Sequence, residues 1–566
     1  MSESITPLML VKVLDSRLTT GALKTYGIEQ GASSITYRQY PSSNLSSSSF
    51  TFNAVNPPSA QTFVDRTVFL QVSFRLDFTG TCPVGQTLLS QWGYDLAPRC
   101  MPLNNSLKNL VVTINGSNFT VDSNDLQALF TRVQFEKLKT FLSESPSTPD
   151  NCQQYSEGVG GTCNVLASAQ NTPPGYPVPR GGFNGCQVLT NTSTAASIVL
   201  TFTEPLVCSP LVYDDTIGSR PAFYNISTFQ VQGNFDTDLA GRLLSISNTS
   251  TATFATVTAT PLAASLYFGY YSAMLAQPLP TVCQFPWYNT QRYIQSGLAL
   301  APGATTTLSM NNVQLSSVPK RFYLFVKPTN SSYSVRQTDT YCRINTVSCQ
   351  FGNRASLLAN CNANQLFQIS KHNGVDASWD QWYGDTSTLP RKFSGCGSVL
   401  CVDPMKDLGL SDFQTSGSSG MIQIQLQVSY TSLIPIGGPT LQFDAYFVTV
   451  DSGLATIPGP NSCLQQTSVV GPNDLLSASM LPTVVTSADV RDANGGSWWS
   501  DVTDWYDRNK SWINPIAKGV SSAAKVIFPE VAPVLSAVGL GHGGAHAGGL
   551  VGGQRISKKR LLSLMQ

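Results

Sequence analysis

The stretch NQLFQISKHNGVDASWDQWYG, residues 364–384, contains side chains that are able to do catalysis. His372 could act as a general base, and Cys361, just upstream, could be the nucleophile that it activates. Asp376 and Asp380 form a carboxylate pair of the kind that glycosidases use as acid and base. Both chemistries require the fold to bring these side chains together in a cleft.

The neighbouring residues favour architecture over catalysis. His372 is followed by Asn-Gly, which is typical of a helix end, and a pair with Cys361 would require 11 residues of chain to fold back. The two aspartates are four residues apart, a spacing that is common on solvent-exposed helices. The other histidines, His542 and His546, lie in a glycine-rich segment. We therefore expect His372 to have no catalytic role.

The known sequence motifs of catalytic and metal sites are missing as well. The chain has no HExxH, no GxSxG, no Walker loop, no GxGxxG followed by a helix and no CxxC. We therefore predict that the protein is not an enzyme and holds no cofactor and no metal.

The composition restricts the possible partners and the compartment. Charged residues make up only 12% of the chain and the net charge is +1, which argues against a protein that holds nucleic acid by bulk charge. The 13 cysteines are an odd number, and the N-terminus lacks a signal-peptide pattern. We expect mostly free thiols and synthesis without a secretion signal, although loop disulfides Cys82–Cys100 and Cys152–Cys163 stay open. No apolar run reaches 18 residues, so no membrane span is predicted.

Alternating apolar and polar residues predict that strands dominate the chain. Between residues 67 and 79 every second residue is apolar, which indicates a long half-buried strand. The segment 110–116 ends in Asn-Gly, a hairpin signal. Further strands are predicted at 197–202, 226–235, 255–274, 305–317, 320–328, 341–351, 397–402, 421–430 and 441–450.

Two helical insertions interrupt the strands in the same order. Residues 124–142 have helical apolar spacing after a strand and a polar turn, and the stretch from 364 onwards repeats this order. The repetition predicts two similar β-sandwiches that divide near residue 240. We expect residues 1–45 to be an N-terminal arm.

The composition changes again after about residue 485. Trp498, Val502, Trp505 and Trp512 follow one helical stripe with a charged opposite face. This helix could pack its aromatic stripe on the body, or it could contact a membrane or a partner protein. A Gly/Ala linker and a short basic end follow it, and the basic end could meet nucleic acid weakly.

The order of several segments resembles the double jelly-roll major capsid proteins of eukaryotic DNA viruses, in particular virophages, polinton-like viruses and their relatives. The matching segments fall within about residues 48–450, in family order: 56–80, 101–116, 204–213, 224–235, 311–328, 344–384 and 397–410. The long loop after the first helix and the tryptophan-rich tail lie outside the resemblance.

The resemblance implies an all-β fold of two consecutive eight-stranded jelly rolls with short helical insertions, at 46–240 and 241–485, followed by a helical and flexible C-terminal tail at 486–566. It implies a major capsid protein of the virion, which assembles as homotrimeric, pseudo-hexameric capsomers that tile an icosahedral shell. The implied partners are other copies of the chain, penton and minor capsid proteins, and an internal membrane or the genome through the tail.

One short motif in the tail resembles a maturation site. LVGGQ, with Leu550, Gly552, Gly553 and Gln554, resembles the sites that adenovirus-type proteases cut. A plain glycine linker is the alternative interpretation.

Two rival functions remain open at this stage. A single-jelly-roll capsid protein of a small RNA virus, with a protruding domain, would usually carry a basic arm, which this chain lacks. A carbohydrate-binding or glycan-cleaving β-sandwich protein would need a secretion signal and an aromatic or carboxylate cleft.

The stretch of residues 364–384 is therefore expected to be an element of architecture. Leu366, Phe367 and Ile369 should pack on the second sandwich, while Trp379 and Trp382 should anchor the following loop.

Overall fold

Strands form most of the part of the chain that the structure describes. The computed structural model describes residues 9–14, 24–30, 34–59, 62–92, 96–99, 101–126, 186–211, 220–246, 252–272, 282–330, 334–335, 341–375, 377–384, 397–409, 417, 419–434 and 439–467. All of them belong to one unit, Met1–Ser477. The predicted tail helix, with Trp498, Val502, Trp505 and Trp512, and the motif from Leu550 to Gln554 lie outside the described residues.

The alternation near residue 70 produces strand β7 (Phe69–Thr81). Its apolar side chains are buried at every second position, with Leu70, Val72 and Phe74 at most 1% exposed. Because successive side chains of a strand point to opposite faces, this pattern buries one face of β7 and leaves the other polar. β7 pairs on one side with β12 (Ala195–Pro205) and on the other with β16 (Thr253–Ser272).

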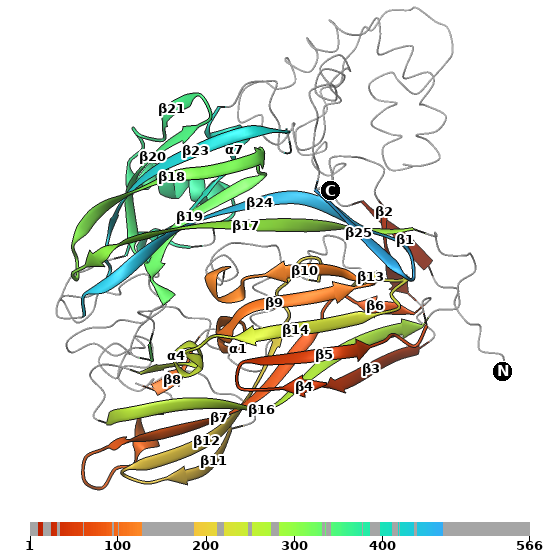
Figure 1. Ribbon diagram of the computed structural model, residues 1–566, viewed down its shortest axis with the longest axis horizontal. Helices are drawn as coiled ribbons and strands as arrows, with labels where there is room; N and C mark the ends of the chain where they lie inside the picture. The colour runs from red at the N-terminus through yellow and green to blue at the C-terminus, as the bar shows by residue number, and fades with distance from the viewer. Residues whose placement is uncertain are drawn as a thin grey trace, which may run out of the picture. The chain divides into compact units, whose positions relative to one another are not determined.

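The first sandwich consists of two main sheets (Figure 1). The larger sheet runs in the order β1-β2-β13-β6-β16-β7-β12-β11, and β3 also pairs with β16. Its other strands are β1 (Met9–Leu14), β2 (Lys24–Gln30), β3 (Ser34–Pro41), β6 (Phe63–Asp65), β11 (Cys186–Asn191) and β13 (Arg220–Phe223). The smaller sheet runs β10-β9-β14-β5-β4. Its strands are β4 (Asn44–Leu45), β5 (Ser49–Val55), β9 (Leu107–Ile114), β10 (Ser117–Val121) and β14 (Phe229–Phe235).

Short elements close the first sandwich. They are η1 (Leu88–Gln91), β8 (Leu96–Pro98), α1 (Pro102–Ser106), α4 (Leu239–Leu243) and β15 (Leu244–Ile246), with β8 paired to β15.

The second sandwich also has two sheets (Figure 1). One runs β17-β24-β19-β22, with β25 also paired to β24, and the other runs β18-β23-β20-β21. The strands are β17 (Cys283–Leu300), β18 (Thr305–Ser317), β19 (Arg321–Pro328), β20 (Arg343–Phe351), β21 (Arg354–Leu357), β22 (Val399–Val402), β23 (Ser419–Thr431), β24 (Leu441–Gly459) and β25 (Ser462–Thr467). The helices are α5 (Ala363–His372), α6 (Trp379–Tyr383) and α7 (Pro404–Asp407), and no helix among the described residues is long and apolar enough to cross a membrane.

The two sandwiches repeat one strand order. The path β3-β16-β7-β12 of the first corresponds to β17-β24-β19-β22 of the second. The path β5-β14-β9-β10 corresponds in the same way to β18-β23-β20-β21. Two four-stranded sheets with this order form a jelly roll, so the prediction of two consecutive eight-stranded jelly rolls is confirmed.

Two of the expected domain limits differ from the strand pairing. The segment expected to be an arm supplies β3, which pairs along β16 from Ser265 to Ser272. The sequence of β3 lacks the apolar–polar alternation of a half-buried strand, because large side chains such as Ile35 and Tyr37 are exposed, by 54% and 72%. Strand β16 follows the expected division near residue 240 but pairs with β7, so the first sandwich extends to Ser272. The amino-acid pattern identifies a strand but not the sheet that the strand joins.

The predicted Asn-Gly hairpin forms between β9 and β10. Asn115 and Gly116 have φ angles of 46° and 86°. Positive φ at both central residues gives the turn whose twist matches that of the flanking strands. The turn fixes the register of β10 and thereby the place where the first helical insertion starts.

The described cysteines carry free thiols. They include Cys82, so the alternative disulfide Cys82–Cys100 does not form, whereas Cys152 and Cys163 lie outside the described residues. Burial raises the pKa of several of these thiols, for example that of Cys208 to about 12, and this keeps them protonated and unreactive.

Candidate functional site

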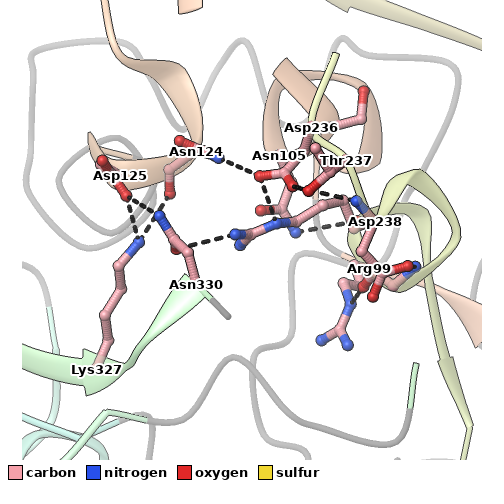
Figure 2. A network of polar contacts seen from close by, with 12 residues as sticks. Arg99, Asn105, Asn124, Asp125, Asp236, Thr237, Asp238, Lys327 and Asn330 are labelled. Carbon is pink, nitrogen blue, oxygen red and sulfur yellow. Dashed lines mark hydrogen bonds and ion pairs between the residues drawn. The ribbon is translucent and has the colours of Figure 1, made fainter. Parts of the chain in front are cut away.

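A buried cluster of charged side chains joins the two sandwiches (Figure 2). The first sandwich contributes the start of its helical insertion, where residues 123–126 are helical directly after β10. The second contributes Arg292 from β17, Lys327 from β19 and Asn330 just beyond β19. We call this cluster the ionic junction.

Asp125 is the centre of the ionic junction. Its side chain is only 2% exposed. One carboxylate oxygen, Oδ1, accepts hydrogen bonds from Lys327 Nζ at 2.9 Å and from Asn330 Nδ2 at 3.2 Å. The other oxygen, Oδ2, pairs with Arg292 Nη1, and Arg292 Nε reaches Asp122 Oδ2 at 2.9 Å. One carboxylate of the first sandwich therefore holds two cations of the second.

Lys327 is enclosed by groups from both sandwiches. Its side chain is 4% exposed, and its ammonium group also donates to the backbone oxygen of Asn124 at 3.3 Å. The ammonium lies 4.6 Å from the centre of the Tyr446 ring, so a cation–π contact adds to the ion pair. Burial lowers the pKa of Lys327 well below its ordinary value, and the nearby cations Arg242 and Arg292 lower it further. The charged form of Lys327 thus depends on the carboxylate beside it.

A second branch of the junction runs through Arg242 of α4. The side chain of Arg242 is 2% exposed, and its Nε donates to Asp236 Oδ2 at 3.2 Å. Its Nη2 donates to Asn330 Oδ1 at 2.9 Å, which connects this branch to the second sandwich. Asp236 also accepts a bond from Asn124 Nδ2 at 2.7 Å. Burial opposes the ionisation of Asp236, but Arg242 and these hydrogen bonds hold its pKa below the ordinary value.

Arg99 ties the loop after β19 to the first sandwich. Arg99 is fully buried, and its Nε donates to the backbone oxygen of Gly241 at 2.6 Å. Its Nη2 donates to the backbone oxygen of Ser334, at 3.0 Å. Asn105 also holds α4, by donating to the backbone oxygen of Arg242 at 3.0 Å. The cations of the junction are therefore held by carbonyl oxygens as well as by carboxylates.

Aromatic side chains form a second contact between the sandwiches. The rings of Phe223 and Phe285 lie 4.6 Å apart, and Phe119 meets Trp287 edge to face at 6.0 Å. Arg66 covers the Phe223 ring, with its guanidinium carbon 5.1 Å from the ring centre. Apolar burial thus accompanies the ion pairs and holds the two sandwiches together.

The arrangement of the ionic junction suits a structural role and not a catalytic one. Its carboxylates are saturated by cations and amides. Among the described residues no group of three or more His, Cys, Asp or Glu side chains is arranged to bind a metal ion. Removing one partner of a buried ion pair typically costs about 3–5 kcal/mol, because the other charge stays buried without compensation. We conclude that the junction fixes the relative position of the two sandwiches.

The predicted anchor residues lie around α5 and α6. Leu366 is fully buried, Phe367 is 9% exposed and Ile369 packs against the core while half-buried. Trp382 is 1% exposed, and Trp379 stacks beside it with ring centres 6.1 Å apart.

Hydrogen bonds fix the position of Trp382 further. Its Nε1 donates to the backbone oxygen of Val399 at 2.9 Å, and its own backbone oxygen accepts from Ser398 Oγ at 2.9 Å. α6 is therefore attached to β22 through both the ring and the backbone of Trp382.

His372 is the last residue of α5 and is exposed to solvent. Its Nδ1 lies 2.8 Å from the backbone oxygen of Gln368, within the same helix. The helix starts at a capping box, in which Asn362 and Gln365 each accept a hydrogen bond from the other's backbone N–H. The side chains of Asp376 and Asp380 lie outside the described residues.

Sequence reasoning missed the ionic junction. Its members are spread from Arg99 to Asn330, and no local spacing connects them. Two signals were present: a lysine inside the apolar strand KRFYLFVKP, and two aspartates at the start of a predicted helix in DSND. A charge in a strand that is otherwise apolar requires a buried partner, but the sequence does not say which partner.

Comparison with known proteins agrees with the repeated strand order. Residues 8–276 match the family model of the Sputnik virophage major capsid protein 1st domain, and residues 285–453 match that of the major capsid protein V20 C-terminal domain. The putative capsid protein V20 of Sputnik virophage is 28% identical over 600 residues, covering 99% of each chain. The chain belongs to the double jelly-roll capsid proteins of the virophage type.

Solved structures of virophage-type capsid proteins have the same fold. A chain in the cryo-EM structure of the Sputnik virophage superposes with a TM-score of 0.68 at 25% identity, over 88% of this chain and all of that one. The crystal structure of the mavirus major capsid protein gives a TM-score of 0.63 at 16% identity, over 85% of this chain and all of that one.

The family membership decides between the functions left open by the sequence. This virophage-type capsid protein is a structural component of the virion, so the prediction that it is not an enzyme is confirmed. The single-jelly-roll interpretation is wrong because the strand order occurs twice. The carbohydrate-binding interpretation is not supported either, because the family consists of structural capsid proteins.

Proposed function

We propose that this capsid protein assembles as a homotrimer, in which six jelly rolls form a pseudo-hexameric capsomer that tiles an icosahedral shell. The observation that carries the proposal is the repeated strand order together with the ionic junction. Two similar sandwiches held rigidly at a fixed angle make one third of a six-part ring, and closed rings are the common result of head-to-tail contacts.

The oligomer's mass and outline test this proposal. Light scattering of the purified full chain should give a mass of three times 60.8 kDa, and negative-stain images should have a hexagonal outline. A monomer, or a symmetric dimer, at the concentrations used for assembly would refute it.

The remaining partners are proposed from the same assignment. Penton and minor capsid proteins would complete the shell, and the C-terminal tail from about residue 486 would face an internal membrane or the genome. Crosslinking with mass spectrometry on purified virions tests this, because crosslinks from Lys558 and Lys559 only to the outer surface would contradict it.

Cleavage within LVGGQ is proposed as a maturation step. Hydrolysis after Gly553 would release a 13-residue basic peptide that begins at Gln554. Intact-mass measurement of capsid protein from mature particles tests this cleavage. The loss of residues 554–566 is expected, and a full-length chain would exclude cleavage.

A further inference from the structure

One part of the ionic junction is a contact between a helix start and an edge strand. The helical insertion of the first jelly roll reaches Arg292 on β17, and within the described residues β17 pairs only with β24. The first jelly roll therefore presents its helix start, and the second presents its edge strand.

The second jelly roll has the same helix start in the same place. After β10 the backbone N–H of Leu126 donates to the oxygen of Asp122 at 3.1 Å, and after β21 that of Leu366 donates to the oxygen of Asn362 at 3.0 Å. Both leucines are buried, at 2% and 0% exposure. Asp122 thus corresponds to Asn362, and Asp125 corresponds to Gln365.

The first jelly roll has the matching edge strand. β3 stands where β17 stands in the repeat, and within the described residues it pairs only with β16. Its outward side chains Ile35 and Tyr37, opposite Tyr271 and Gly269 of β16, are 54% and 72% exposed. Large apolar side chains at this exposure on an edge strand are typical of an interaction surface.

A surface groove lies beside the helix start of the second jelly roll. A groove of about 440 Å³ runs along α5 and is lined by side chains that include Asn364, Gln368, Ile369 and His372. Amide side chains supply most of the lining residues, and Ile369, His372 and the carboxylate of Asp407 complete the lining. An aromatic ring with a hydroxyl group, such as that of Tyr37, matches such a lining because it offers both apolar area and a hydrogen-bonding group.

The charges of the two surfaces are compatible. In the ionic junction the helix start carries Asp122 and Asp125, and the edge strand answers with Arg292. At the corresponding positions the helix start of α5 carries the neutral Asn362 and Gln365. On β3 the outward face carries Ile35 and Tyr37, whereas the cation Arg38 lies on the other face because successive side chains of a strand alternate. The acidic helix start of the first jelly roll therefore faces a basic edge strand, and the uncharged helix start of the second corresponds to an edge strand whose outward face is uncharged.

We propose that the α5 groove of one copy binds the β3 edge of a second copy, with Tyr37 entering the groove. This rests on the proposed trimer and names its interface. The contact joins two different surfaces, so it propagates head to tail and closes when the third copy meets the first. The ionic junction within each chain and this contact between chains then alternate around the ring.

Charge substitutions on each surface test the proposal. Tyr37→Arg removes the aromatic ring that enters the groove, and Gln368→Arg fills the groove with a longer, charged side chain. Each should therefore convert the trimer to monomer at the concentration where the wild type is trimeric. Met421→Arg, at an 88% exposed position on β23, is the matched control and should remain trimeric. Circular dichroism spectra at the assay temperature should be unchanged for all three, because each altered side chain is exposed.

Mixing the two interface variants tests the head-to-tail geometry. The Tyr37→Arg chain keeps an intact α5 groove, and the Gln368→Arg chain keeps an intact β3 edge. One good contact is then available, so the mixture should form a heterodimer and nothing larger. A mixture that restores trimers would contradict the proposed contact.

A crosslink gives the positive test. Benzoylphenylalanine at position 37 should attach, upon irradiation, to the peptide that contains residues 362–372 of another chain, as shown by mixing isotope-labelled and unlabelled protein. If the wild type is not trimeric, the proposed function fails. If it is trimeric while the Tyr37→Arg variant stays trimeric or the crosslink forms elsewhere, only this interface is wrong.

Discussion

Replacing Asp125 by Ala should strongly destabilise the described body of the protein. The side chains of Asp125 and Lys327 are 2% and 4% exposed, so solvent cannot replace the lost carboxylate. Among the described residues, the ammonium would keep direct contact with the backbone oxygen of Asn124 and the Tyr446 ring, while the carboxylates of Asp236 and Asp444 would act on it without a hydrogen bond. A buried charge without its partner costs about 3–5 kcal/mol in free energy of unfolding.

The neighbouring substitution should cost less. Lys327→Met leaves Asp125 paired with Arg292 and bonded to Asn330, so the remaining charge is still compensated. We expect a loss of about 1–3 kcal/mol, which is the cost of a lost bond to a charged group. The double variant Asp125→Ala/Lys327→Met should lose less than the sum of the two single variants, by about 0.5–3 kcal/mol.

Denaturant unfolding of the full chain, followed by tryptophan fluorescence, measures these free energies. The exposed pair Arg75–Asp77, with side chains 47% and 37% exposed, supplies the control: Arg75→Gln should cost at most about 1 kcal/mol. If Asp125→Ala were no more destabilising than Arg75→Gln, the ionic junction would not hold the sandwiches together.

Three further outcomes follow from single residues. Trp382→Ala should cost about 3–5 kcal/mol in unfolding free energy, because a fully packed ring and its hydrogen bond to Val399 are lost. Trp379→Ala changes a partly exposed position and should cost clearly less. Equal effects of the two variants in denaturant unfolding would contradict the anchor role of Trp382. His372→Gln should leave the oligomer unchanged in light scattering, since a glutamine amide matches the other amides that line the α5 groove. Dissociation of the trimer would show that the imidazole ring itself is required in that groove. Burial raises the pKa of Glu204 from 4.5 to about 7, against the hydrogen bonds that it accepts from the start of α1. Since the folded protein holds this proton more tightly than the unfolded chain, the stabilisation is complete below about pH 4.5 and is lost as the pH rises through 7, on the order of 3 kcal/mol. Thermal unfolding from pH 5 to 8 should therefore show a downward slope that Glu204→Gln lacks, and identical slopes would rule out this titration.

The jelly-roll strands were predictable because their signals are local. The alternation along β7 and β23, the Asn-Gly turn at Asn115 and the cap of α5 at Asn362 each depend on residues a few positions apart. Backbone geometry and burial act over that same range, so the sequence determined the type and approximate limits of these elements. The order of such segments also sufficed for the resemblance to the capsid family.

The tertiary structure alone decided which elements meet. β3 gave no burial pattern because its outward side chains face solvent, and its place became clear only from its pairing with β16. Asp125 and Lys327 are 202 residues apart, and no spacing rule connects them. A buried charge requires a partner, which the sequence can indicate, but the partner's identity depends on how two sandwiches pack, and only the folded chain determines that.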